Sequence, residues 1–269
     1  MPELARFGTN APRPRALEET LEWAAANRFG WVDFNADAAP NGVHDFDDAR
    51  VRRVRDLCAR HGLKIGIHTS SAVNNAEVAP YVGDAVDAYL QANVALAARL
   101  GCGWVIVHGG YHFGDVARRR DAAVARLQRL LRVAERHQMP LWFENHNKEP
   151  DLAEIHYIPD NVEELRWYLE APGLADSPLF RWSFNAAHAF LVPEGIPGFI
   201  AAFGVQRTAQ VRLTDNTGEY EVHLVPGQGK IDFPDLFRRL DAAGYGGPFS
   251  LDFGTDEDKI RVRDAWLAL

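Results

Sequence analysis

The sequence contains few cysteines, and it lacks both a long apolar run and an excess of positive charge. Two cysteines, Cys58 and Cys102, are too few for the disulfide framework of a small secreted protein. No apolar run approaches the length that spans a bilayer. The formal net charge of -8 provides no long-range attraction to nucleic acid or to anionic membranes. We therefore expect neither a nucleic acid nor a membrane as a partner.

The sequence also lacks segments that would export or divide it. The first ten residues, MPELARFGTN, contain neither the basic block nor the apolar block of a signal peptide. No stretch rich in proline, serine or glycine resembles a linker. With 269 residues, of which 47% are hydrophobic, the chain can form a full-sized core. We expect one domain over residues 1–269, located in the cytoplasm.

Strand-like and helical patterns alternate along the whole chain. Apolar runs of strand length are followed by segments in which apolar residues recur every three or four positions. This alternation, at a spacing of roughly 30–40 residues, favours a single (β/α)8 TIM barrel over an open doubly wound sheet. The segment FGTNAPRP after the first strand lacks the glycine spacing of a dinucleotide-binding loop. The expected strands are 5–9, 31–35, 64–68, 104–108, 141–145, 181–185, 209–213 and 249–253.

Local signals predict where some helices begin. Asp160 with Glu163, and Thr255 with Asp258, have the spacing of a capping box. The segment 195–203 is the weakest expected helix, because a proline lies in its first turn. Connections from strand to helix are long at 69–80, 146–160 and 214–232, whereas those from helix to strand are short. Because a barrel forms its active site from the loops that follow its strands, we expect the site there.

Polar and ionisable residues follow these strands in a recurring pattern. Glu144 follows the buried run LWF, and Asp252 ends the last strand. A buried carboxylate requires a cation, a metal or several hydrogen-bond donors, and a structural ion pair at the barrel mouth would also satisfy it. Since the fifth and eighth strands of a barrel face each other, the two carboxylates could exchange a proton with opposite faces of one carbon. The full set of such residues is His68, His108, Glu144, Asn185, His188, Arg212 and Asp252.

Several motifs resemble one known family. The chain is similar to the sugar-phosphate isomerase/epimerase group of xylose-isomerase-like barrels, and more distantly to endonuclease IV. The resemblance covers essentially the whole chain, and its last two segments are the most specific. The motifs are FEN (143–145), NAAHA (185–189), RLTDN (212–216), VHLVPGQGKIDF (222–233) and GYGGPFSLD (244–252).

The resemblance implies one divalent metal (Mn, Mg or Zn) held by Glu, Asp, His and a second Glu. The matching residues here are Glu144, Asn185, Arg212 and Asp252. A guanidinium group stays protonated and cannot ligate a metal. We therefore favour a site without a cofactor, in which Arg212 replaces the cation and stabilises an oxyanion. If a metal is bound, its expected ligands are Glu144, Asp252, His68 and His108.

The histidines have two interpretations. The resemblance to endonuclease IV implies zinc sites at His68, His108 and Glu144 and at His188, Glu221 and His223. In the single-metal sugar enzymes, by contrast, the counterparts of His188 and His223 resemble substrate-contacting residues. The expected substrate-binding residues are therefore His188, His223, Asn185, His68, His108 and Glu221.

The leading hypothesis is an isomerase or epimerase of a sugar-like, polyhydroxylated carbonyl compound. Glu144 and Asp252 would move the proton next to the carbonyl group, and Arg212 would act as the electrophile. A dehydratase or lyase could start from the same enediolate. The alternatives are a catalytically inactive barrel that binds a small molecule and a metal-dependent phosphodiesterase. The expected partner is a small sugar-like substrate, and formation of a homo-oligomer stays open.

Overall fold

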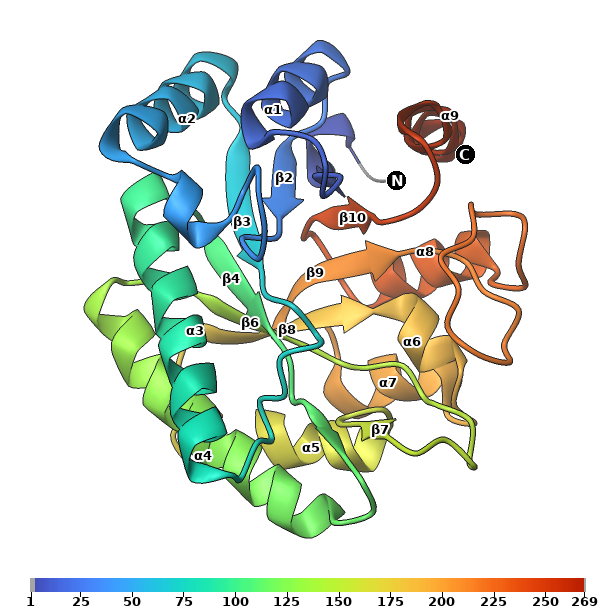
Figure 1. Cartoon of the computed structure of the whole chain (residues 1–269). Coiled ribbons are helices and arrows are strands. Elements are labelled where there is room, and N and C mark those ends of the chain that lie inside the picture. Colours follow the sequence, from blue (N-terminus) through green and yellow to red (C-terminus); the bar gives the residue numbers. More distant parts are fainter. Residues whose placement is uncertain (1–2, 269) are drawn as a thin grey trace.

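Eight parallel strands form a closed barrel in this computed structural model, which describes residues 3–268 (Figure 1). Positions 1, 2 and 269 of the expected domain lie outside the described residues. The order around the barrel is β1-β10-β9-β8-β6-β4-β3-β2, which confirms the (β/α)8 fold. Its strands are β1 (Phe7–Asn10), β2 (Trp31–Phe34), β3 (Lys64–His68), β4 (Trp104–Val107), β6 (Leu141–Glu144), β8 (Phe180–Asn185), β9 (Thr208–Leu213) and β10 (Phe249–Leu251).

Helices surround the barrel, and a two-stranded antiparallel ribbon of β5 (Tyr111–His112) and β7 (His156–Tyr157) lies outside its sheet (Figure 1). The weakest expected helix is confirmed as α7, with the bounds that the sequence predicts. Within residues 3–268, no helix is both long enough and apolar enough to cross a membrane. The helices are α1 (Leu17–Ala26), α2 (Asp48–His61), α3 (Pro80–Leu100), α4 (Val116–Arg136), α5 (Val162–Leu169), α6 (Ala186–Phe190), α7 (Gly195–Phe203), α8 (Phe233–Ala242), α9 (Asp256–Leu267) and two short 3-10 helices, η1 (Leu4–Arg6) and η2 (Val43–Asp45).

Tryptophans fill the N-terminal half of the barrel interior. The rings of Trp104 and Trp142 stack with their centroids 4.4 Å apart, and Trp31 meets Trp104 edge-on. Two glycines make room for these rings, and each lies on the strand next to the tryptophan that it pairs with. A Cβ atom at Gly8 would lie 1.9 Å from Trp31, and one at Gly66 would lie 1.9 Å from Trp104. These rings therefore fill the barrel interior below the strand ends, as in a packed core.

The first strand begins later than the sequence predicts. Leu4–Arg6 forms a 3-10 turn, and pairing with β10 begins where Phe7 lies opposite Phe249. The Arg6 guanidinium group donates to the backbone carbonyl of Gly247 at 2.8 Å, which holds the turn against the last strand. At the other end of the barrel, β4 and β10 end at Val107 and Leu251. His108 and Asp252 therefore lie just beyond their strands, on the loops.

The predicted capping box at Asp160 and Glu163 is wrong by one residue. Asn161 is the N-cap of α5, and its side chain accepts from the backbone N–H of Glu164 at 3.0 Å. The Glu164 carboxylate in turn accepts from the N–H of Asp160 at 3.1 Å. Asparagine and aspartate are equally good N-caps, so the local sequence does not separate the two positions. The box of Thr255 and Asp258 at the start of α9 is confirmed.

The displaced cap generates a prediction about stability. Burial, and to a smaller extent the neighbouring Asp160, raise the pKa of Glu164 to about 7. Because the folded pKa lies above the unfolded value of 4.5, the folded chain keeps a proton that the unfolded chain releases. The free energy of unfolding should therefore fall as pH rises from about 4.5 to about 7.

Glu164→Gln keeps an acceptor oxygen but cannot ionise. We expect its unfolding free energy to fall with pH by about 1–2 kcal/mol less than that of wild type, after discounting for partial exposure. Urea unfolding at pH 5 and pH 8 measures the difference. Glu135→Gln, at an exposed position on α4, is the matched control. Equal pH dependence in wild type and Glu164→Gln would contradict the assignment.

Candidate active site

Polar and ionisable side chains converge on a pocket of about 260 Å³ at the C-terminal end of the barrel, which we call the mouth pocket. Every site residue proposed from the sequence lines this pocket, and the long loops after β3, β6 and β9 contribute much of its wall. The lining residues are Asn10, Arg13, Asn35, His68, Thr69, Ser70, Ser71, His108, Glu144, His146, Asn147, Asn185, His188, Arg212, Thr214, Glu221, His223 and Asp252.

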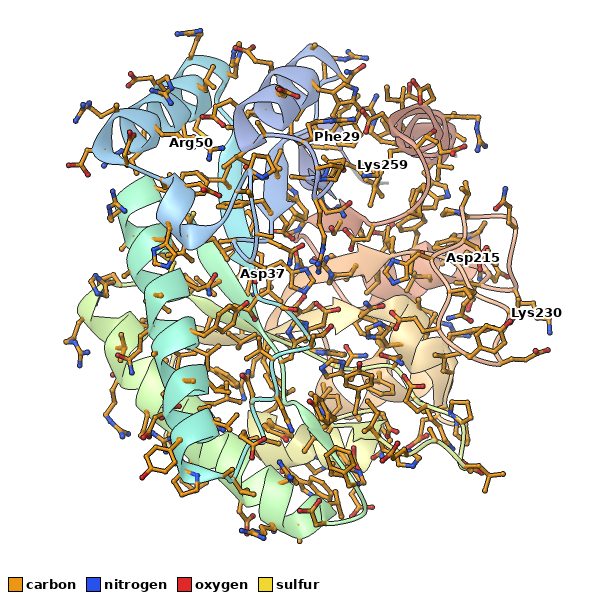
Figure 2. The ribbon with its side chains drawn as sticks, in the orientation of Figure 1. Phe29, Asp37, Arg50, Asp215, Lys230 and Lys259 are labelled. Carbon is orange, nitrogen blue, oxygen red and sulfur yellow. The ribbon has the colours of Figure 1, made fainter. Side chains whose placement is uncertain are left out.

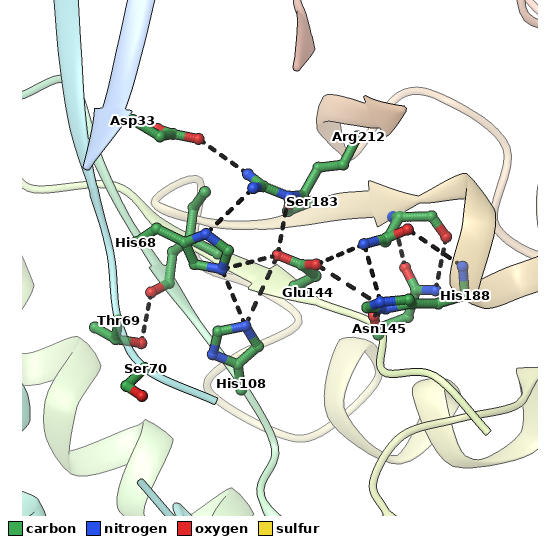
Figure 3. Close-up of polar contacts among 12 residues, drawn as sticks. Asp33, His68, Thr69, Ser70, His108, Glu144, Asn145, Ser183, His188 and Arg212 are labelled. Carbon is green, nitrogen blue, oxygen red and sulfur yellow. Dashed lines mark hydrogen bonds and ion pairs between the residues drawn. The ribbon is translucent and has the colours of Figure 1, made fainter. Parts of the chain in front are cut away.

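Arg212 on β9 places its buried guanidinium group among three carboxylates. Figure 3 shows two of them, Asp33 and Glu144. Its Nη1 donates to Asp33 at 2.9 Å. Its Nη2 lies 2.8 Å from an Asp252 oxygen, and its Nε lies 3.3 Å from Glu144 Oε2. Burial alone would lower the pKa of Arg212, but the carboxylates of Asp252, Glu144 and Asp33 raise it above its usual value. One permanent cation therefore joins carboxylates from three other parts of the barrel.

Glu144 at the end of β6 is buried and is contacted at both oxygens. Oε1 accepts from the side-chain amide of Asn185 at 2.9 Å, and Oε2 lies 3.2 Å from His68 Nε2. Burial alone would raise the pKa of Glu144, but Arg212 and His68 hold it well below its usual value. Glu144 is therefore an ionised carboxylate, with its charge balanced mainly by Arg212.

His68, His108 and Glu144 have the spacing of a metal site. One ligand atom from each lies within 4.8 Å of the others, and no further group of this kind occurs among residues 3–268. The Nε2 atoms of His68 and His108 are 3.1 Å apart. Asp252, the fourth expected ligand, is not a member of this group, and its carboxylate contacts Arg212 instead. The number and spacing of the ligand atoms therefore suit a zinc-like ion.

The protonation of His68 does not suit a metal. Arg212 Nη2 donates to His68 Nδ1 at 3.2 Å, so this ring nitrogen must carry a lone pair. Neutral His68 then carries its proton on Nε2, which is the atom that would ligate the metal. Moving the proton to Nδ1 would place the N–H of His68 against the N–H of Arg212 Nη2, so that two donors would face each other.

His108 lacks the hydrogen-bond acceptor that usually orients a metal-binding histidine. A metal-ligating histidine almost always donates its other N–H to an acceptor. His108 Nδ1 is buried without a hydrogen-bond partner among the described residues. The residues present therefore match a metal in spacing but not in donor chemistry.

His188 on α6 contacts hydrogen-bond acceptors at both ring nitrogens. Nδ1 lies 2.7 Å from the Asn145 carbonyl oxygen, and Nε2 lies 2.6 Å from Glu221 Oε1. Burial alone would lower the pKa of His188, but Glu221 raises it above its usual value. His223 Nε2 lies 2.9 Å from the same Glu221 oxygen. His188, Glu221 and His223 thus form an ion-pair cluster, and they do not have metal-ligand spacing in the described part of the chain.

The loop after β9 carries Glu221 and His223 and is anchored by a buried carboxylate. Asp215, labelled in Figure 2, accepts backbone N–H groups from Gly227 and Gly229 at 2.9 Å and from Ile231 at 3.1 Å. These donors lie in the VPGQGKID segment. The motif therefore fixes the loop that closes one side of the pocket.

Asp33 is only a strand end in the sequence pattern, yet it is central to the site. It is fully buried on β2, and its Oδ1 accepts from Trp104 Nε1 at 2.7 Å. Burial raises the pKa of Asp33, while Arg212 opposes this shift. The sequence does contain a signal for this role, because Asp33 is the one charged residue within the otherwise apolar strand WVDF.

His146 follows Glu144 closely and also contributes to the pocket wall. Its ring stacks on Tyr157 with centroids 4.5 Å apart, so the ribbon of β5 and β7 reaches the pocket. Burial lowers the pKa of His146 to about 3, which makes it a neutral residue.

Known structures share the whole architecture. A D-tagatose 3-epimerase-like protein is 20% identical, with a TM-score of 0.84 and coverage of 98% of this chain and 96% of that one. D-psicose 3-epimerase from Clostridium cellulolyticum is 14% identical, with a TM-score of 0.77 and coverage of 98% and 97%. Endonuclease IV from Thermus thermophilus is 24% identical, with a TM-score of 0.76 and coverage of 98% and 99%.

One protein-family model matches nearly the entire chain. The model of the xylose isomerase-like TIM barrel matches residues 21–268. This match confirms the resemblance that the motifs indicate. The chain belongs to the xylose isomerase-like TIM-barrel family.

Proposed function

We propose that this protein is an isomerase or epimerase of a sugar-like, polyhydroxylated carbonyl compound. The observation that carries the proposal is the Arg212 guanidinium group, held between the carboxylates of Glu144 and Asp252 at the base of the mouth pocket. Proton abstraction next to a carbonyl group needs a base and a fixed positive charge near the developing oxyanion. Structural similarity to sugar epimerases supports this reaction class.

Arg212 supplies the positive charge for the oxyanion. A guanidinium group has five N–H donors. Arg212 forms hydrogen bonds to Asp33 and His68, whereas Asp252 and Glu144 contact it as ion pairs. The N–H groups outside the two hydrogen bonds are left for a substrate oxygen. Because Arg212 is buried and its partners fix its position, its charge needs little reorganisation during the reaction.

Asp252 and Glu144 exchange the proton with the substrate. Asp252 lies at the less buried edge of the cluster, and its second oxygen accepts from Ser250 Oγ at 2.8 Å. Glu144 approaches from β6 and remains ionised. His188, held as a cation by Glu221, orients or protonates an oxygen of the substrate, while His223 and Asn185 contact other hydroxyl groups.

The reaction in this proposal does not pass through a metal. Arg212 Nη2 donates to His68 Nδ1, which opposes binding of a metal by the other nitrogen of that ring. His108 Nδ1 has no hydrogen-bond partner among the described residues to orient its ring towards a metal. A divalent ion at Glu144 Oε2 would also lie beside the Arg212 Nε that is 3.3 Å from this oxygen. Two cations on one oxygen repel each other strongly in a buried site.

Exchange of substrate hydrogen with solvent tests the reaction. In D2O, wild-type protein should incorporate deuterium next to the carbonyl of at least one compound in a panel of free and phosphorylated ketoses and aldoses, followed by NMR. Glu144→Gln and Asp252→Asn should each lower the rate by about 100-fold or more, since each removes a proton acceptor. The exposed Glu135→Gln on α4 serves as the control and should retain full activity.

Two results would overturn this assignment. Saturable binding of a panel compound without any exchange would identify a small-molecule-binding barrel. Full exchange in both carboxylate variants would place the catalytic groups elsewhere.

Metal binding tests the role of Arg212 separately. We expect wild-type protein incubated with Zn²⁺, Mn²⁺ and Mg²⁺ and then gel-filtered to retain no stoichiometric ion by elemental analysis. The double variant Asn185→Asp, Arg212→His should acquire one, because it removes the guanidinium group and supplies two ligands. Asn185→Asp alone is the control and should not acquire an ion. Tight metal binding by wild type that is lost in His68→Ala would contradict the metal-free site.

A further inference from the structure

A second cavity, of about 630 Å³, lies at the N-terminal end of the barrel. Its volume is within the range of small-molecule sites. Much of its rim consists of glycines, so the recess exists where side chains are missing. This cavity and the pocket at the C-terminal end share no lining residue. Inside the barrel, Ile106 and the hydrogen-bonded pair of Ser183 and Gln210 are fully buried and line neither of them. The two cavities are therefore independent binding spaces.

The floor of the second cavity is aromatic. Trp31, Trp104 and Trp142 form it, and their rings are fixed by mutual stacking and edge contacts. The indole N–H of Trp31 donates to the Arg6 carbonyl, and that of Trp104 donates to Asp33. Trp142 Nε1 has no acceptor among the described residues and is not shielded from solvent. Because this N–H is accessible and Trp142 lines the cavity, an oxygen atom of an occupant can accept from it in place of water.

The rim of the cavity carries positive charge only. Arg6, Lys64 and Arg181 line it, and its described lining contains neither aspartate nor glutamate. Arg6 donates to the carbonyl of Gly247, and Arg181 donates to the carbonyl of Thr208 at 3.0 Å. No carboxylate within residues 3–268 forms an ion pair with any of the three cations. In a chain of net charge -8, such a one-signed rim selects an anion.

We infer that this cavity binds a planar aromatic monocarboxylate. The aromatic ring would lie on the indole floor, and the carboxylate would face Arg6, Lys64 and Arg181. Backbone carbonyls hold the two guanidinium groups in place, so they need little ordering when the ligand enters. This site is independent of the reaction proposed for the mouth pocket.

Titration with naphthalene-1-carboxylate, followed by NMR of the indole N–H signals, tests the inference. The seven tryptophans give separate reporters, assigned by single Trp→Phe variants. Saturable shifts should concentrate on Trp31, Trp104 and Trp142. Arg181→Gln should weaken binding of the carboxylate by about threefold to fivefold and leave that of naphthalen-1-ylmethanol unchanged. Lys64→Gln, at an exposed position, provides the same test if Arg181→Gln does not fold, and the exposed Arg132→Gln on α4 is the matched control.

Three outcomes would overturn the inference. They are the absence of saturable shifts at the three indoles, equal weakening of carboxylate and alcohol in the rim variants, and an equal effect of Arg132→Gln. Because the readout is binding at the N-terminal end, a failure of the sugar reaction at the mouth leaves the result unaffected.

Discussion

The site depends on one buried cation. The Arg212 guanidinium group is almost inaccessible to solvent and lies among the carboxylates of Asp33, Glu144 and Asp252. A buried carboxylate without a partner is costly, and three of them beside each other would repel strongly. Arg212 offsets this repulsion and fixes the position of each group. Its removal without a compensating change would leave three unpaired buried charges, so Arg212 is a structural residue as well as a candidate electrophile.

The same guanidinium group influences residues that lie beyond its ion pairs. It donates to His68 Nδ1 and thereby selects the tautomer of that ring. Through Asp33 it is also connected to Trp104 and to the aromatic floor at the opposite end of the barrel. Asp33 therefore belongs to both ends of the barrel interior. A single hydrogen-bonded chain links the mouth pocket to the packed tryptophans.

Much of the fold and of the site is predictable from the sequence. The strands are apolar runs of strand length, and barrel closure brings their C-terminal ends together, which is why Glu144, Arg212 and Asp252 are expected in one pocket. Asp33 and Arg212, by contrast, are 179 positions apart, and their contact depends on side-chain reach across the interior. No local pattern encodes such a pairing.

Other features also depend on details that a linear pattern does not contain. The cap of α5 lies one residue later than predicted because Asn161 and Asp160 are equivalent as N-caps. The cavity at the N-terminal end arises from missing side chains along its rim and from indoles that fit over Gly8 and Gly66. These are properties of packing, which becomes visible only in three dimensions.

The most direct test of the central claim is the tautomer of His68. In protein labelled with ¹⁵N at histidine, two-bond correlations between ring protons and nitrogens distinguish the protonated nitrogen from the one with a lone pair. We expect neutral His68 to carry its proton on Nε2, with the lone pair on Nδ1 facing Arg212, and this pattern should persist when Zn²⁺ is added. A proton on Nδ1, or a shift of Nε2 on addition of stoichiometric Zn²⁺, would show that a metal rather than Arg212 governs the site.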